Sequence, residues 1–189
     1  MKKFLLAVLC LSLVLLMACS PKAPESPSGE SEGKTETAGI LSSFTATDLN
    51  SNKIDESILA DYELTMVNVW ATFCSPCIRE MPDLGELAEE YKENGVQIIG
   101  LVSDVLSSDG TIDQDLLNTA KEIVDKTKAD YIHLLPSNDL LGLLSQINSV
   151  PTTFFVDKDG NQVGSAYLGS KSKADWKAII DETLAEVHK

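Results

Sequence analysis

Three short runs of apolar, β-favouring residues constrain the fold of this chain more than any other feature. They are residues 64–70 (LTMVNVW), 96–102 (VQIIGLV) and 152–156 (TTFFV). Such runs are typical of strands that are buried on both faces of a sheet. Helices must then cover both faces, so the runs favour an α/β domain.

Helical patterns separate these runs along the chain. Apolar residues recur at helical spacing from just after residue 74 to residue 91, and over residues 112–128, 139–147 and 172–187. Further strands are expected at residues 44–49, 131–135 and 162–167, the last after a hairpin turn at residues 157–161. From residue 64 onward the order is β, α, β, α, β, α, β, β, α. Strands joined by helices run parallel and strands joined by a tight turn run antiparallel, so this order predicts a mixed sheet.

The first residues have the pattern of an export signal. Lys2 and Lys3 precede an apolar run over residues 4–17, which is shorter than the roughly 20 residues that a membrane-spanning helix needs. Residues 16–19 (LMAC) resemble a bacterial lipobox, which implies that residues 1–18 are removed and that Cys19 carries a lipid. The alternatives are an ordinary cleaved signal and an uncleaved anchor. The lipoprotein interpretation places the protein on the cell membrane, lipid-anchored and facing the extracytoplasmic side.

The segment that follows Cys19 cannot form a core. Residues 20–39 are rich in Pro, Ser, Gly, Glu, Lys and Thr, with few apolar side chains. We therefore expect residues 19–39 to form a disordered linker and residues 40–189 to form one folded domain. The net charge of −14 argues against nucleic acid as a partner and otherwise favours plain solubility. We expect a monomer.

Only two of the four cysteines, Cys74 and Cys77, fall in the folded part; Cys10 lies in the signal. A helix that begins between them places the first sulfur at its N-terminus, where backbone N–H groups and the helix dipole stabilise a thiolate. The pattern therefore indicates disulfide exchange. The pair is alternatively half of a metal site, but zinc needs four ligands and only His133 and His188 remain. A peroxidase that uses a single cysteine would need no second cysteine so close in sequence, so the pair favours disulfide exchange over that alternative.

Two motifs carry a family resemblance. Residues 68–82 (NVWATFCSPCIREMP) resemble the active-site run of the thioredoxin-like TlpA/ResA reductases, and residues 150–152 (VPT) resemble the cis-proline loop of that family. The resemblance covers roughly residues 40–189. It implies a thioredoxin-like three-layer α/β/α sandwich with a mixed central sheet. It also implies extracytoplasmic redox chemistry that uses the cysteine pair and no other cofactor or metal.

The resemblance assigns a role to each matching residue. Cys74 would be the exposed nucleophile, Cys77 the buried resolving thiol and Glu80 an acid that moves protons or raises a thiol pKa. Substrate would bind along Val150 and a cis Pro151, next to Phe73 and Pro76. Support would come from Trp70 beneath the site, from Pro82 as a kink in the helix, and from Asn68. Two departures stand out, because Asn68 replaces the buried acid of cytoplasmic thioredoxins and Phe73 replaces a more usual tryptophan.

The resemblance leaves three functions open. The first is a reductase that receives electrons from a membrane thiol transporter of the DsbD/CcdA kind and passes them to apocytochrome c, methionine sulfoxide reductases or other exported disulfide proteins. The second is a disulfide-forming oxidase or isomerase, although Ser75 and Pro76 lack the histidine that strong oxidants of this fold carry between their cysteines. The third is a copper-binding chaperone that would use His133. Residues 103–128 resemble an insertion of the family and receive no substrate role.

Overall fold

Five strands build one mixed sheet in this protein, whose computed structural model describes residues 39–189. The predicted signal peptide, Cys19 and the linker up to residue 38 lie outside the described residues. The strands are β3 (Leu64–Trp70), β4 (Val96–Val102), β5 (Ile132–Leu134), β6 (Thr152–Asp157) and β7 (Gln162–Leu168). Their order is β5-β4-β3-β6-β7, with β3, β4 and β5 mutually parallel and β6 antiparallel to both β3 and β7. The predicted mixed sheet is confirmed.

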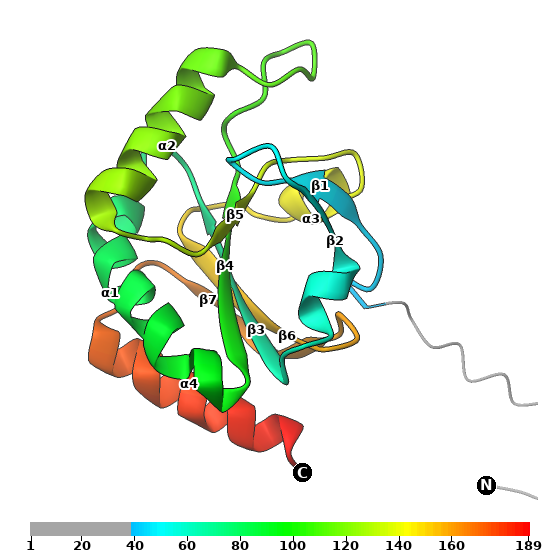
Figure 1. Ribbon diagram of the computed structural model, residues 1–189, viewed down its shortest axis with the longest axis vertical. Helices are drawn as coiled ribbons and strands as arrows, with labels where there is room; N and C mark the ends of the chain where they lie inside the picture. The colour runs from blue at the N-terminus through cyan, green and yellow to red at the C-terminus, as the bar shows by residue number, and fades with distance from the viewer. Residues whose placement is uncertain (1–38) are drawn as a thin grey trace, which may run out of the picture. The chain divides into compact units, whose positions relative to one another are not determined.

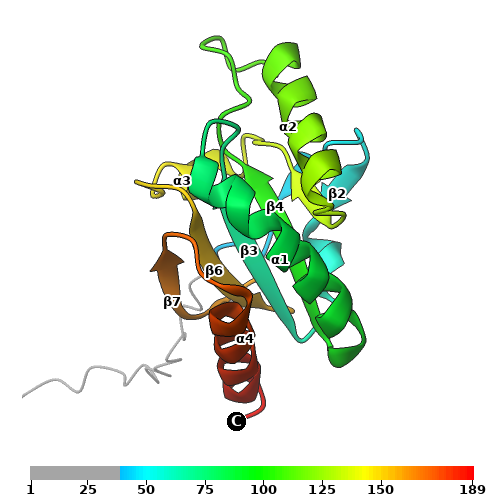
Figure 2. The same ribbon diagram turned by 90° about the vertical axis from the view of Figure 1, so that its left-hand side faces the viewer.

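Helices cover both faces of the sheet (Figure 1). They are α1 (Ser75–Tyr91), α2 (Gln114–Thr127), α3 (Leu141–Leu144) and α4 (Lys173–Val187). Figure 2 shows α1 crossing the face of the sheet with α4 beside it, while α3 lies on the opposite side. The three-layer arrangement expected from the resemblance is therefore present. Among residues 39–189 no helix is both long enough and apolar enough to cross a bilayer.

The alternation of side chains along β3 divides the core between the two faces. Val67 and Val69 belong to the cluster under α3, together with Phe44, Leu59 and Phe154. Met66 and Trp70 point the other way, in two further clusters. Met66 packs with residues of α1 and α4, and Trp70 packs with residues of α1 and α2. Asn68 lies between them on the same face and is fully buried. A polar side chain at the centre of the sheet therefore faces the helix that carries the cysteines.

The N-terminal part of the domain differs from the expectation. The predicted edge strand is reduced to β1 (Thr45–Thr47), which pairs with an unforeseen strand β2 (Lys53–Asp55) in a separate two-stranded sheet. The Asp48 carboxylate accepts hydrogen bonds from the backbone N–H groups of Asn50 and Asn52, both at 2.8 Å, and so closes the hairpin. A single bridge from Asp48 to Leu134 joins this hairpin to the edge of β5. A 3₁₀ helix, Glu56–Leu59, follows β2.

The short helix α3 is also smaller than expected. The sequence predicts a helix over residues 139–147, but only Leu141–Leu144 form an α-helix. The backbone N–H groups of Leu140, Gln146 and Ile147 bond to carbonyls three residues earlier, which is the pattern of tight turns. The first helix, by contrast, ends at Tyr91 as expected. A 3₁₀ helix, Lys92–Asn94, follows it directly, and Gly95 closes that turn in the left-handed conformation at φ 75°.

Candidate active site

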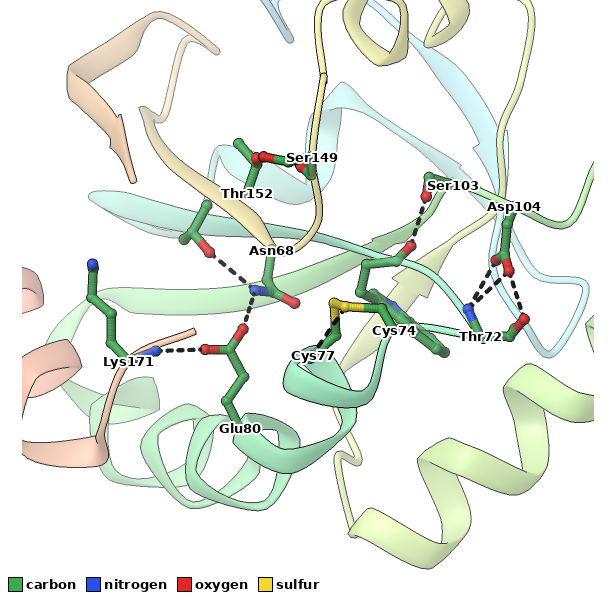
Figure 3. Close-up of a disulfide and its surroundings, with 12 residues drawn as sticks. Asn68, Thr72, Cys74, Cys77, Glu80, Ser103, Asp104, Ser149, Thr152 and Lys171 are labelled. Carbon is green, nitrogen blue, oxygen red and sulfur yellow. Dashed lines mark hydrogen bonds between the residues drawn. A yellow bond between two sulfur atoms is a disulfide. The ribbon is translucent and has the colours of Figure 1, made fainter. Parts of the chain in front are cut away.

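Cys74 and Cys77 form a disulfide at the N-terminus of α1, directly after the carboxyl end of β3 (Figure 3). Cys74 is the N-cap residue, and its sulfur accepts a hydrogen bond of 3.3 Å from the backbone N–H of Cys77. Pro76 lies in the first turn, where a missing N–H leaves no helical bond unmade. The same N–H groups and the helix dipole would stabilise a thiolate on Cys74 after reduction.

The two sulfurs are less accessible than the resemblance implied. Cys74 is 4% exposed and Cys77 is fully buried, so the expectation of an exposed Cys74 is wrong for the disulfide form. Both cysteines pack in the cluster that contains Trp70, against which Val150 also packs. Phe73, by contrast, is 76% exposed. The order of access still favours Cys74 as the sulfur that a substrate reaches first.

Trp70 packs beneath the disulfide, as expected, and a buried histidine holds its indole. Trp70 Nε1 donates to His133 Nδ1 at 3.1 Å, and His133 Nε2 donates to the carbonyl of Ala129 at 2.9 Å. The two contacts fix the neutral tautomer with its proton on Nε2. Burial lowers the pKa of His133 to about 4, although the Ala129 hydrogen bond opposes the shift. Both ring nitrogens are engaged, so His133 supports Trp70 and has no nitrogen to spare for a copper ion.

We predict that Gly100→Ala destabilises the domain by about 2 kcal/mol, in the range of overpacked cores. Gly100 is the β4 neighbour of His133, and a Cβ there would lie 2.2 Å from His133 Nδ1. The imidazole would have to move away from Trp70, which breaks the indole hydrogen bond. Urea unfolding measures the effect.

Gly142→Ala is the matched control for that measurement. Gly142 lies in α3, and a Cβ there meets nothing within 4 Å. We expect this variant to match or slightly exceed the parent protein in stability, because alanine favours a helix over glycine. Equal unfolding midpoints for the two glycine variants would contradict the packing argument for His133.

Glu80 is buried on α1, three residues after Cys77, and is 3% exposed. Three groups donate to its carboxylate, each at 3.1 Å: Asn68 Nδ2 to Oε1, and both the backbone N–H of Lys171 and Trp176 Nε1 to Oε2. Burial raises the pKa of Glu80, and these hydrogen bonds oppose the increase without cancelling it. Glu80 is therefore a buried acid about one helical turn after Cys77, with a carboxylate held by three donors.

Sequence reasoning missed two of the three donors to Glu80. The sequence predicts that Trp176 faces the core, but not that it bonds an acid, and it gives Lys171 no role. A buried tryptophan needs an acceptor for its N–H, and this requirement could have flagged the pair. The lysine side chain also lies over the rings of Tyr167 and Trp176, with its nitrogen 5.5 Å and 5.6 Å from their centroids. The start of α4 is thereby attached to the acid behind the cysteines.

The segment after β4 holds the loop that leads into Cys74. Asp104 accepts from the backbone N–H of Thr72 at 3.1 Å and 2.9 Å, and from its hydroxyl at 2.5 Å. Ser103 bonds through both its N–H and its hydroxyl to the carbonyl of Trp70. The start of the segment over residues 103–128 therefore positions the turn between β3 and α1.

The Val150–Pro151 peptide bond is cis, as the resemblance implied. The carbonyl of Pro151 accepts from the N–H of Gly169 at 2.9 Å, and the hydroxyl of Thr152 donates to the carbonyl of Ser149 at 2.7 Å. These contacts fix the loop, and Val150 packs against the cluster that holds the disulfide. Two motifs far apart in sequence thus meet at one end of the sheet. Pro82 lies inside α1, and its predicted kink stays a prediction.

Comparisons with known proteins agree with this geometry. The model of the AhpC/TSA family matches residues 40–163. Over 140 residues the chain is 33% identical to a thiol-disulfide oxidoreductase ResA of Bacillus cereus, an alignment that covers 74% of this chain and 73% of that relative. The chain belongs to the AhpC/TSA family, as a thiol–disulfide oxidoreductase of the ResA kind. The ResA of Geobacillus kaustophilus is 29% identical over 151 residues, or 78% of this chain and 80% of that relative.

Solved structures confirm the thioredoxin-like fold of this ResA-like oxidoreductase. A thiol:disulfide interchange protein of Chlorobium tepidum TLS aligns with a TM-score of 0.61 at 22% identity, over 75% of this chain and 93% of that one. The redox group of such an enzyme is its own disulfide, here Cys74–Cys77, and the fold needs no added cofactor.

Proposed function

We propose that this oxidoreductase works as a reductase of exported disulfide proteins, anchored by a lipid on Cys19 at the extracytoplasmic face of the cell membrane. The observation that carries the direction is the disulfide itself, which spans Ser75 and Pro76 with no basic side chain and has the buried acid Glu80 behind it. A cation between the cysteines would stabilise the thiolate and make the protein a stronger oxidant. Its absence between Cys74 and Cys77 favours reduction of substrates.

The reaction proceeds in two exchange steps. The Cys74 thiolate attacks one sulfur of a substrate disulfide, a mixed disulfide forms, and the other substrate sulfur leaves as a thiolate that takes up a proton. Cys77 then loses its proton and attacks Cys74, which releases the second substrate sulfur and restores the enzyme disulfide. We propose that Glu80, about one helical turn after Cys77, accepts the proton of Cys77 in this second step. The substrate gains two electrons and two protons in total.

The surface beside the cis-proline loop suits an extended substrate segment. An apolar groove of about 280 Å³ borders Ser149 and Thr152 and is lined further by Leu143, Ile147, Phe154 and Leu168. The exposed ring of Phe73, next to Cys74 in sequence, offers a separate apolar contact. Apocytochrome c and methionine sulfoxide reductases remain the substrate classes we propose, with a membrane thiol transporter of the DsbD/CcdA kind as electron donor.

We predict that Cys77→Ser traps substrates as mixed disulfides with Cys74, because no second thiol remains to resolve them. Affinity purification of the variant from living cells, followed by non-reducing electrophoresis and mass spectrometry, measures the adducts. Cys74→Ser/Cys77→Ser is the matched control, since it keeps the fold and loses both thiols. Recovery of the same bands from both variants, or of none, would contradict covalent exchange.

The reduction potential separates the reductase from an oxidase or isomerase. A reductase is expected to equilibrate near the thioredoxin value of about −270 mV, whereas a strong oxidant lies near −120 mV. Redox equilibration of the purified protein with glutathione buffers measures it. A value near that of the strong oxidants would overturn the reductase proposal and leave thiol–disulfide exchange intact.

A further inference from the structure

Only the nitrogen of the Asn68 side-chain amide forms hydrogen bonds within the described residues. Asn68 Nδ2 donates to Glu80 Oε1 at 3.1 Å and to Thr153 Oγ1 at 3.0 Å, so both of its protons are used. Its oxygen, Oδ1, is buried and has no hydrogen-bond partner among the described residues 39–189. In Figure 3 this oxygen lies on the side of the Asn68 amide that faces the sulfurs of Cys74 and Cys77. The orientation follows from the acid, because an ionised carboxylate can only accept.

The unpaired oxygen has a consequence for the redox state of the site. A buried acceptor without a donor is costly, and native structures rarely leave one unmatched. The sulfurs of a disulfide carry no proton and cannot satisfy it. A reduced Cys77 carries an S–H group, buried on the same side of α1 as Glu80. Reduction therefore supplies the donor that Asn68 Oδ1 lacks.

We propose that Asn68 is a positioning residue that stabilises the reduced enzyme, with Oδ1 accepting a hydrogen bond from the thiol of Cys77. The inference rests on the proposed function and adds a group that acts on the buried thiol. In the step concerned, a donor dithiol breaks the Cys74–Cys77 bond, is itself oxidised to a disulfide, and leaves two electrons and two protons on the cysteines. One of these protons forms the S–H···Oδ1 contact.

The charge of Glu80 sets which end of the amide faces the sulfur. Ionised Glu80 holds Nδ2 and turns Oδ1 toward Cys77, which favours the protonated thiol. Protonated Glu80 presents an O–H donor instead, so the amide reverses and turns Nδ2 toward the sulfur, which favours the thiolate. Asn68 thus couples the two groups: when Glu80 gains a proton, the pKa of Cys77 falls.

Other groups that face Glu80 bear on this exchange. The loop before α4 supplies the charge and the backbone N–H of Lys171, and the first turn of α4 supplies the uncharged indole of Trp176. From the residue before β5 comes the hydroxyl of Tyr131, which is buried and has no partner among the described residues. Burial and the charge of Glu80 raise the pKa of Tyr131. None of these three bonds the Asn68 amide.

Asn68→Leu tests the contact, since leucine has a similar shape without polar atoms. We expect the equilibrium constant for reduction of the full-length protein by dithiothreitol or glutathione to fall roughly tenfold, or about 30 mV toward more negative potential. A merely structural asparagine would change the unfolding midpoint without moving this constant. Asn68→Ala serves if the leucine variant fails to fold.

Thr153→Val is the matched control for the reduction equilibrium. It removes the second acceptor of Nδ2 and leaves Glu80 to hold the amide, so the equilibrium constant should change less than twofold. An unchanged constant in both Asn68 variants, or an equal change in Thr153→Val, would overturn the inference.

Glu80→Gln tests the coupling separately. The glutamine keeps its oxygen toward Lys171 and Trp176 and turns its NH₂ group toward Asn68, which reverses the Asn68 amide. The pKa of Cys77 in the reduced protein, followed by NMR of its Cβ, should therefore fall further in Glu80→Gln alone than in the same substitution made in the Asn68→Leu background. If Glu80→Gln shifts the pKa of Cys77 equally in both backgrounds, Glu80 acts on Cys77 through its charge alone. That result would refute the amide reversal.

Two different results would contradict the proposed function and the role of Asn68. Failure of the wild-type protein to reduce the interchain disulfides of insulin with dithiothreitol would defeat the reductase proposal. Normal insulin reduction by the wild type, together with an unmoved equilibrium in Asn68→Leu and Asn68→Ala, would defeat only the role of Asn68.

Discussion

Cys74→Ser is expected to lower the rate of disulfide reduction by roughly a thousandfold or more, as removal of a catalytic nucleophile does. The hydroxyl of serine is far less acidic than a thiol, so the N-terminus of α1 cannot ionise it at neutral pH. The effect is measured as turnover of insulin or of a fluorescent disulfide peptide. It should exceed that of any other single substitution in the site.

Cys77→Ser is the control for the loss of the disulfide, because both variants lack that crosslink. The Cys77→Ser protein keeps the Cys74 thiolate and should still complete one attack, seen as a stoichiometric burst of released thiol. A burst from Cys74→Ser, or none from Cys77→Ser, would reverse the roles given to the two sulfurs. The buried position of Cys77, which is fully inaccessible, argues for the present assignment.

The fold was predictable because its central strands β3, β4 and β6 are buried on both faces. Such strands cannot tolerate polar alternation, and the runs at residues 64–70 and 96–102 match β3 and β4 residue for residue. Helices on both sides of the sheet then follow from the need to cover it. The strand at β1 was predicted, but its partner β2 was missed because β2 has only three residues and no buried one, so it shows no period in the sequence.

The site was predictable only in part, for a similar physical reason. Cys74 and Cys77 are neighbours in sequence, so their chemistry follows from spacing and from the helix that begins between them. The environment of Glu80 is built by Lys171 and Trp176, which lie 91 and 96 residues further along the chain. Only the packing of α4 against α1 brings them together. The sequence showed that an acid was present, whereas its burial and its three donors required the structure.

The same limit applies to the support beneath the disulfide. From the sequence alone, a single histidine in a short strand, such as His133, can be a buried structural residue or a surface residue. The structure connects His133 to Trp70 on one side and to Ala129 on the other. Together with Asp104, which holds Thr72, it forms a polar frame around an otherwise apolar redox centre. That frame fixes the geometry in which Cys74 and Cys77 exchange a bond.

Lowering the pH from 7 to 4 is expected to cost the folded protein about 3 kcal/mol through His133 alone. The pKa of His133 is lowered from 6.5 to about 4 in the folded state, chiefly by burial. Above pH 6.5 the folded and unfolded chains both hold a neutral imidazole, and the contribution to stability is complete. As the pH falls, the unfolded chain binds a proton that the folded one resists, so stability is lost toward pH 4. Urea unfolding of the oxidised protein at pH 7, 5.5 and 4 measures it.

His133→Gln isolates this contribution, because glutamine can accept from Trp70 Nε1 and does not titrate. The variant should be less stable than the wild type at pH 7 and should lose about 3 kcal/mol less between pH 7 and pH 4. The raised pKa of Glu80 acts in both proteins and cancels in the difference. Parallel curves of unfolding free energy against pH for His133→Gln and the wild type would contradict this prediction. They would mean that His133 has the same pKa in the folded and the unfolded chain, so that its buried site beneath Trp70 accepts a charged imidazole.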